Sequence, residues 1–140
     1  MSTATSTVGT AIPAWRPDSV TEERMRTMAL FLRDPNPIHY DTDVTAAAGM
    51  GDRAVNQGPS NVAYVMNMLI AWAGSPAAVR RLNVRFNANV FAGDEVEATG
   101  EVTATEVTDA GTVATCDVRL TRADGTVLVS GIAEVLLPAA

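Results

Sequence analysis

The stretch from Val62 to Ala73 is apolar at nearly every position, and Asn67 interrupts it. Pro59 and Ser60 stand just before it, where a helix can begin. A membrane span needs about 20 consecutive apolar residues, so this stretch is too short to cross a bilayer. A helix that is apolar on all sides and too short for a membrane must be buried in the protein itself. The sequence therefore predicts a central helix that the rest of the chain covers.

The second half of the chain changes to the period of a half-buried strand. From Arg80 onward, apolar residues alternate with polar ones over about 80–90 and 95–104. Turn sequences at 89–95, 108–111 and 122–125 separate these strands from two more, over about 112–122 and 126–137. We expect an antiparallel meander with one apolar face, and this sheet can wrap around the buried helix. The predicted fold class is α+β.

The first half is expected to hold two further helices. Apolar residues recur at helical spacing across residues 20–32, behind the hydroxyl and acidic residues typical of a helix start. Asp41 can cap a second, short helix across residues 44–48. We interpret residues 1–10 as a flexible tail that leads into a short strand. At 140 residues and 47% hydrophobic, the chain is expected to form one domain over 1–140.

The segment RDPNPIHYD, residues 33–41, holds the one histidine of the chain, His39, five positions after Asp34. Pro35 and Pro37 favour extended backbone at the residues before them and exclude an α-helix. A loop stiffened in this way can turn two side chains toward one point at low entropic cost. An imidazole that accepts a proton from water, beside a carboxylate that orients this water, is a plausible acid/base pair. From spacing alone, a polar surface histidine in a loop is the more common explanation.

Composition excludes several classes of function. A net charge of −6 argues against a nucleic-acid-binding surface. One histidine and one cysteine cannot form a zinc site of the usual kind, and Cys116 has no disulfide partner, so we expect no metal and a reducing cytoplasm. We expect no secretory leader and no membrane partner. In the absence of nucleophile-elbow, P-loop and dinucleotide motifs, a cofactor-free reaction driven by proton transfer remains, such as adding or removing water across a double bond.

Three segments, taken in order, resemble the MaoC-type (R)-specific enoyl-CoA hydratase and dehydratase family of the hotdog fold. They are the D-x-N-P-x-H loop at 34–39, Gly58 at the start of the buried helix, and the V-F-A-G-D-E-V turn at 90–96. The resemblance covers about residues 15–137; the loop is its specific motif, whereas many hotdog proteins share the turn. It implies a five- or six-stranded antiparallel sheet around the central helix, in subunits that dimerise so that sites form at their boundary.

The resemblance also implies an activity. In the family, the matching aspartate and histidine bind one water and add its elements to a trans-2-enoyl thioester, giving a 3-hydroxyacyl thioester, or run the reverse dehydration. Asp34 and His39 inherit these roles. The backbone amide that polarises the thioester carbonyl corresponds to Gly58, and a helix N-terminus offers such an N–H group. No separate cofactor is implied, because coenzyme A is part of the substrate.

The chain departs from the family immediately before and after Gly58. Family members commonly carry His-Gly-Met there, whereas this chain has Gln57 in place of the imidazole and Pro59, which has no N–H, after the glycine. Gln57 remains a candidate for binding the substrate beside the oxyanion donor. These replacements are expected to change the geometry of the backbone donor at Gly58 and the shape of the pocket for the acyl group.

Three more residues are assigned to the predicted site. Asn36 is expected to hold the loop in shape through its side chain. Arg80 and Arg85, at the start of the first strand of the second half, could bind the phosphates of coenzyme A, although solvated strand residues explain them equally well.

The expected partners are an acyl-CoA or acyl-carrier thioester and a second hotdog subunit, identical or not. The chain lacks the longer insertion of relatives that take bulky acyl groups, which leaves open a site split with a non-identical subunit. Two alternative functions also stay open: a non-catalytic subunit that completes a partner's site, and a thioesterase. The sequence does not distinguish fatty, polyketide and steroid-like acyl groups, nor coenzyme A from an acyl carrier protein.

Overall fold

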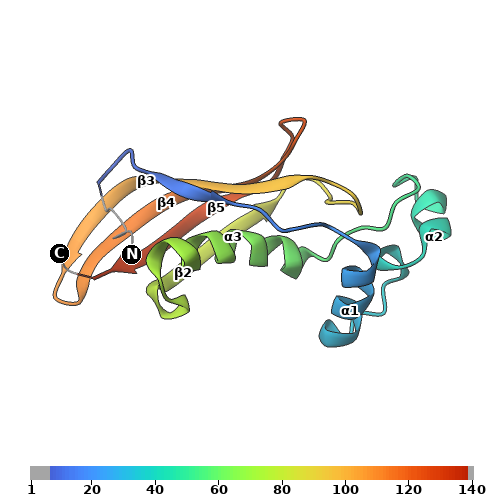
Figure 1. Ribbon diagram of the computed structural model, residues 1–140, viewed down its shortest axis with the longest axis horizontal. Helices are drawn as coiled ribbons and strands as arrows, with labels where there is room; N and C mark the ends of the chain where they lie inside the picture. The colour runs from blue at the N-terminus through green and yellow to red at the C-terminus, as the bar shows by residue number, and fades with distance from the viewer. Residues whose placement is uncertain (1–6, 139–140) are drawn as a thin grey trace.

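The computed structural model describes residues 7–138, which form one antiparallel sheet, one long helix and two shorter helices (Figure 1). The elements are β1 (Ala11–Trp15), α1 (Glu22–Leu32), η1 (Pro37–His39), α2 (Thr42–Ala47), α3 (Gly58–Ala73), η2 (Pro76–Ala78), β2 (Val79–Phe86), β3 (Val96–Thr108), β4 (Gly111–Arg122) and β5 (Val127–Leu137). The five strands lie in the order β1-β3-β4-β5-β2.

All the predicted strands are present, but one has a different neighbour. β3, β4 and β5 form an antiparallel meander through the predicted turns. β2 pairs with β5 at the far edge of the sheet, so the chain crosses the sheet between β2 and β3. The expectation of one meander through all four strands is therefore wrong. Turn residues show where a strand ends, but not which strand it pairs with.

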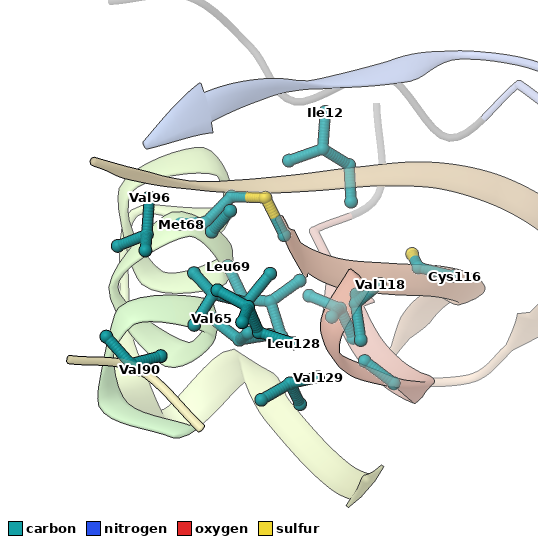
Figure 2. Close-up of a cluster of buried hydrophobic side chains, with 14 of the residues drawn as sticks. Ile12, Val65, Met68, Leu69, Val90, Val96, Cys116, Val118, Leu128 and Val129 are labelled. Carbon is teal, nitrogen blue, oxygen red and sulfur yellow. The ribbon is translucent and has the colours of Figure 1, made fainter. Parts of the chain in front are cut away.

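The core lies between α3 and one face of the sheet. α3 contacts all five strands, and Val65, Met68 and Leu69 on this helix are fully buried. Figure 2 shows these side chains beside Val118 of β4 and Leu128 of β5. The predicted arrangement of an antiparallel sheet around a long apolar helix is confirmed.

The far side of α3 stays open. Ala63, Asn67 and Ala71 lie on this side and are exposed. The sequence predicted that α3 is buried on every side. Within one chain it is buried only on the side that faces the sheet. One sheet can cover only one side of a helix, so the other side of α3 is exposed in the single chain.

The pairing of the N-terminal segment starts before β1. The Gly9 N–H donates to the Val102 carbonyl at 2.8 Å, and the Val102 N–H donates to the Thr10 carbonyl at 2.9 Å. Residues 1–6 of the predicted tail lie outside the described residues.

α1 and α2 lie beyond the N-terminal end of α3 (Figure 1). Both helix predictions are confirmed to within two residues at each end, and the predicted cap of α2, Asp41, accepts a hydrogen bond from the Asp43 N–H. Leu30 and Phe31 of α1 are 81% and 79% exposed. None of the helices formed by residues 7–138 combines the length and apolar character required to cross a membrane.

Candidate active site

The segment after α1 is shaped by its own short-range hydrogen bonds. Arg33 ends α1 in the left-handed conformation with φ of 51°, and the Asp34 N–H donates to the Ala29 carbonyl at 3.0 Å. Asn36 is extended, and its Oδ1 accepts from the Ile38 N–H at 3.3 Å. These bonds fix the direction in which the chain leaves the helix.

The two prolines exclude an α-helix but allow one turn of 3₁₀ helix, η1. Pro37 fits the first position of this turn because the N–H that it lacks would have no intrahelical acceptor there. The Asn36 N–H donates to Asp34 Oδ1 at 3.0 Å. Asn36 therefore caps the turn with its side chain and orients the aspartate with its backbone, in agreement with a loop-shaping role.

Asp34 and His39 are brought together by this turn. Asp34 Oδ2 lies 3.2 Å from His39 Nε2, and the His39 side chain is 8% exposed against 33% for Asp34. On the other side of the ring, His39 Nδ1 lies 2.6 Å from the Val55 carbonyl oxygen. A carbonyl oxygen can only accept, so Nδ1 carries a hydrogen and Nε2 is the nitrogen that exchanges a proton beside the carboxylate.

Val55 connects this pair to the start of α3. Its N–H donates to the Ile38 carbonyl at 2.9 Å, while its own carbonyl accepts from His39. Both backbone groups of one residue thus hold η1. Gly58, which opens α3, follows three residues later, so a short extended segment joins the acid/base pair to the helix N-terminus.

The first turn of α3 leaves one backbone donor free. The Ser60 and Asn61 N–H groups both donate to the Gln57 carbonyl, at 3.1 and 3.2 Å, and Pro59 has no N–H. The Gly58 N–H has no acceptor among residues 7–138. Pro59 therefore does not remove the predicted oxyanion donor; it leaves Gly58 as the donor at this helix end.

A cavity of about 320 Å³ opens at Gly58. A Cβ at this position would lie 3.4 Å from Cζ of Phe86, so the bare glycine backbone faces an aromatic ring. The other residues around the cavity are four asparagines and one alanine: Asn56, Asn61, Asn87, Asn89 and Ala88.

Gln57 is 1% exposed and is turned toward α1. Its Nε2 donates to the Met25 carbonyl at 2.7 Å, and its Oε1 is buried without a partner among the described residues. The amide cannot flip without placing two acceptors face to face. Gln57 ties the start of α3 to α1. Its side chain is enclosed and is not among the residues around the Gly58 cavity, where the sequence placed it as a substrate-binding residue.

A buried amide network supports the cavity wall. Asn56 Nδ2 donates to Asn61 Oδ1 at 2.8 Å and to the Tyr64 hydroxyl at 3.2 Å. Tyr64 stacks on Trp15 with ring centroids 5.9 Å apart. This network was not predicted from the sequence. Its only sign in the sequence is that Asn56, Asn61 and Tyr64 lie within eight residues of one another around the start of α3.

The turn at 90–96 is held by one buried carboxylate. Asp94, whose side chain is 4% exposed, pairs with Arg53 at 2.8 Å and Arg122 at 3.0 Å, and accepts from the Phe91 N–H at 2.9 Å. The adjoining Asn56 N–H donates to the Val90 carbonyl. This turn therefore braces the segment that leads to Gly58.

The arginines predicted to bind phosphate lie on β2. Arg80 sits at a β-bulge between Val79 and Arg81. Arg85 neighbours Phe86 and lines a cavity on the face of the sheet opposite α3. Neither belongs to the residues around the Gly58 cavity.

Comparison with known proteins identifies the family. A family model described as "MaoC like domain" matches residues 3–123. The chain belongs to this family. The matched range includes Asp34, His39 and Gly58.

Three similar proteins show how far this likeness extends. The chain is 34% identical, over 76 residues, to the 3-oxo-4,17-pregnadiene-20-carboxyl-CoA hydratase beta subunit of Mycobacterium tuberculosis; the match spans 54% of this chain and 58% of that relative. The (R)-hydratase of A. caviae involved in PHA biosynthesis aligns over 94% of this chain and 97% of its own, with 26% identity and a TM-score of 0.81. A chain of the ChsH1-ChsH2 complex from Mycobacterium tuberculosis aligns over 95% and 99%, with a TM-score of 0.78; at 24% identity it shows the hotdog fold.

Proposed function

We propose that this MaoC-like chain adds water to trans-2-enoyl thioesters of coenzyme A, giving (R)-3-hydroxyacyl thioesters, or removes water in the reverse direction. The observation that carries the proposal is the 3.2 Å approach of Asp34 Oδ2 to His39 Nε2, with Nδ1 of the same ring fixed on a backbone carbonyl. A ring held in this way presents a single exchangeable nitrogen beside a carboxylate.

In the hydration direction, one water binds beside the pair, in contact with both Asp34 Oδ2 and His39 Nε2, which lie 3.2 Å apart. Nε2 can accept a proton from this water because Nδ1 already holds its hydrogen toward Val55. The water oxygen then forms a bond to C3 of the enoyl thioester, and the π electrons of the C2–C3 double bond move toward the thioester carbonyl. A proton from the pair adds to C2, so the product gains the elements of water and the pair returns to its starting state.

The negative charge that develops on the thioester oxygen is assigned to the Gly58 N–H. A single donor at an oxyanion site contributes about 3–4 kcal/mol to transition-state stabilisation in well-studied enzymes. The partial positive charge of the α3 N-terminus acts in the same direction. Pro59 has no N–H, and the Ser60 and Asn61 N–H groups donate to the Gln57 carbonyl, so the proposal assigns the oxyanion to the Gly58 N–H alone.

We also propose that the chain works together with a second hotdog subunit. One relative is named as a beta subunit, and one aligned chain belongs to a two-component complex. The open side of α3, the free edge of β2 and the 54% exposed Phe86 offer a surface for such a subunit. Measuring the mass of the purified chain, alone and co-expressed with hotdog proteins encoded beside it, tests this proposal: a stable monomer that binds none of them contradicts it.

The hydratase assignment is tested with crotonyl-CoA and longer trans-2-enoyl-CoAs, by following the loss of absorbance of the conjugated thioester. Asp34→Asn and His39→Ala are each expected to lower kcat/KM by roughly 10²-fold or more. Asp43→Asn is the matched control, because it removes an exposed carboxylate four residues after His39, in the first turn of α2. Release of free thiol would indicate a thioesterase, and equal rates for all four proteins would exclude the assigned pair.

A non-catalytic subunit is the second candidate, favoured by the beta-subunit relative and by the replacement at Gln57. It predicts that Asp34→Asn does not change the rate of the assembled complex. The same variant therefore separates the two candidates.

A further inference from the structure

The arginines of this acidic chain are unequally neutralised. Most of those on the first helix and on the turns pair with a carboxylate. Arg81 and Arg85 on β2 and Arg119 on β4 form no ion pair with residues 7–138. Arg33 and Arg80 also form no ion pair with these residues, so four of the five unpaired arginines lie on β2 and β4.

Two of these arginines lie in one row across the sheet. Arg85 of β2 is the register partner of Ser130 of β5, and Ser130 is in turn the register partner of Arg119 of β4. Neighbours along the strands, such as Val118 and Val129, are buried toward α3, so the row points to the opposite, outer face. With strands about 4.8 Å apart, the two arginine backbones are about 10 Å apart.

The serine between the arginines is oriented as a donor. Asn87 Nδ2 donates to Ser130 Oγ at 3.0 Å, so this oxygen is already used as an acceptor and its hydrogen is free to point elsewhere. A cavity of about 300 Å³ lies over Arg85, Arg119 and Ser130. Two planar guanidinium groups and a hydroxyl hydrogen match the acceptor oxygens of a phosphate group.

Asn87 connects this row to the candidate active site. It lines the cavity at Gly58 and also bonds to Ser130. Arg85 and Phe86 are consecutive on β2, so their side chains point to opposite faces of the sheet, and the Phe86 ring faces Gly58. A ligand with its carbonyl at Gly58 and a long anionic arm can pass the end of β2 at Asn87, the residue after its last one, and reach the outer face.

One carboxylate opposes the arginines. Asp117 lies two residues before Arg119 on β4 and lines the same cavity, so it faces a bound phosphate with the opposite sign. Two positive charges and a hydroxyl donor still exceed one negative charge, and removing Asp117 should tighten phosphate binding.

We propose that the row of Arg85, Ser130 and Arg119 binds phosphate groups in the nucleotide portion of coenzyme A. This inference rests on the proposed function, since it takes the acyl thioester to lie at Gly58. Of the two arginines that the sequence suggested for phosphate binding, the proposal keeps Arg85 and leaves out Arg80. It adds Arg119 and Ser130, which belong to no recognisable motif in the sequence.

The test compares crotonyl thioesters of coenzyme A, 3′-dephospho-coenzyme A and pantetheine, using the chain with any subunit that it needs. Arg85→Gln and Arg119→Gln are each expected to raise KM for the coenzyme A thioester about tenfold at unchanged kcat, the loss expected for one charge-assisted contact. Asp117→Asn is expected to lower this KM. Rates with the pantetheine thioester should be the same in all variants. Arg81→Gln is the matched control, on the same strand and face but opposite Glu134.

Equal losses with the pantetheine thioester would show that the arginines act on folding or on the reaction itself, and would overturn the inference. The wild type could instead hydrate only thioesters of an acyl carrier protein, with a higher KM for them in Arg85→Gln and Arg119→Gln. This result would mean that the row binds a carrier protein and not coenzyme A. If the wild type hydrates no thioester, the proposed function fails, and calorimetric binding of coenzyme A decides separately: binding that is absent, or equal in wild type and Arg85→Gln, overturns the phosphate site.

Discussion

His39 and Val55 are sixteen residues apart in the sequence, yet Nδ1 of the histidine lies 2.6 Å from the carbonyl oxygen of the valine. This bond sets which ring nitrogen holds a hydrogen, and it places the other nitrogen beside Asp34. Because Val55 also holds Ile38 through its N–H, the segment before α3 positions the whole acid/base turn. The histidine and the N-terminus of α3 are therefore joined through the two backbone hydrogen bonds of Val55.

If Asp34 and His39 act on one water, their substitutions should not be independent. Each single variant, Asp34→Asn or His39→Ala, removes the same proton transfer, so the double variant should be about as slow as the slower single variant. Steady-state kcat/KM with crotonyl-CoA measures this. Losses that multiply would mean that the two groups serve separate steps.

Gln57→Met should separate stability from activity. The methionine side chain has a similar length, loses the bond to Met25, and removes a buried acceptor whose burial costs about 1–3 kcal/mol. The free energy of unfolding should stay within about 1 kcal/mol of the wild type, while kcat falls because α3 is no longer tied to α1. Urea titration and the enoyl-CoA assay measure the two effects.

Gln57→Glu is the contrasting variant for the same position. A buried carboxylate would face the Met25 carbonyl without a hydrogen to donate, which should destabilise the protein by several kcal/mol at neutral pH. A neutral effect of this variant would show that Gln57 is not enclosed as the structure has it.

Local patterns in the sequence were sufficient for the elements and for the acid/base loop. Periodicity, caps and turns predicted the helices and strands because these depend on neighbours within a few residues. Pro35 and Pro37 predicted a stiff loop after Asp34. The family motif predicted that Asp34 and His39 act together, and they lie in contact in the structure.

Features that depend on contacts between distant segments were not predictable in this way. The pairing of β2 with β5 depends on tertiary packing, since turn residues do not specify a partner strand. Val55 contacts His39 and Ile38 through its backbone carbonyl and N–H. Nearly every residue type has these groups, so the identity of the side chain does not reveal this role. The open side of α3 was missed because apolar composition does not reveal whether the covering surface belongs to the same chain.

Asp94→Asn should destabilise the fold, because the side chain of Asp94 is 4% exposed and holds three partners. The buried carboxylate holds Arg53, Arg122 and a backbone N–H. Removing its charge leaves the half-exposed Arg53 without its ion pair and Arg122 with only the exposed Asp124, at a cost of about 1–3 kcal/mol. Asp124→Asn is the control, because this exposed carboxylate lies 3.8 Å from Arg122 and should contribute nothing measurable. Chemical denaturation of both variants measures the difference, and equal midpoints would contradict it.

Cys116 should make the protein lose stability in alkaline solution. Burial, with a smaller contribution from the negative charge of Asp117, raises the pKa of the thiol from 9.0 to about 11. The unfolded chain therefore releases this proton at a lower pH than the folded chain, so stability falls as the pH rises from about 9 through 11, by at most about 3 kcal/mol. Cys116→Ala should lack this part of the decline when both proteins are unfolded with urea across this pH range. In the native protein at pH 8 the thiol should also resist alkylation until urea unfolds the chain, and rapid labelling without urea would show that the sulfur is neither buried nor held protonated.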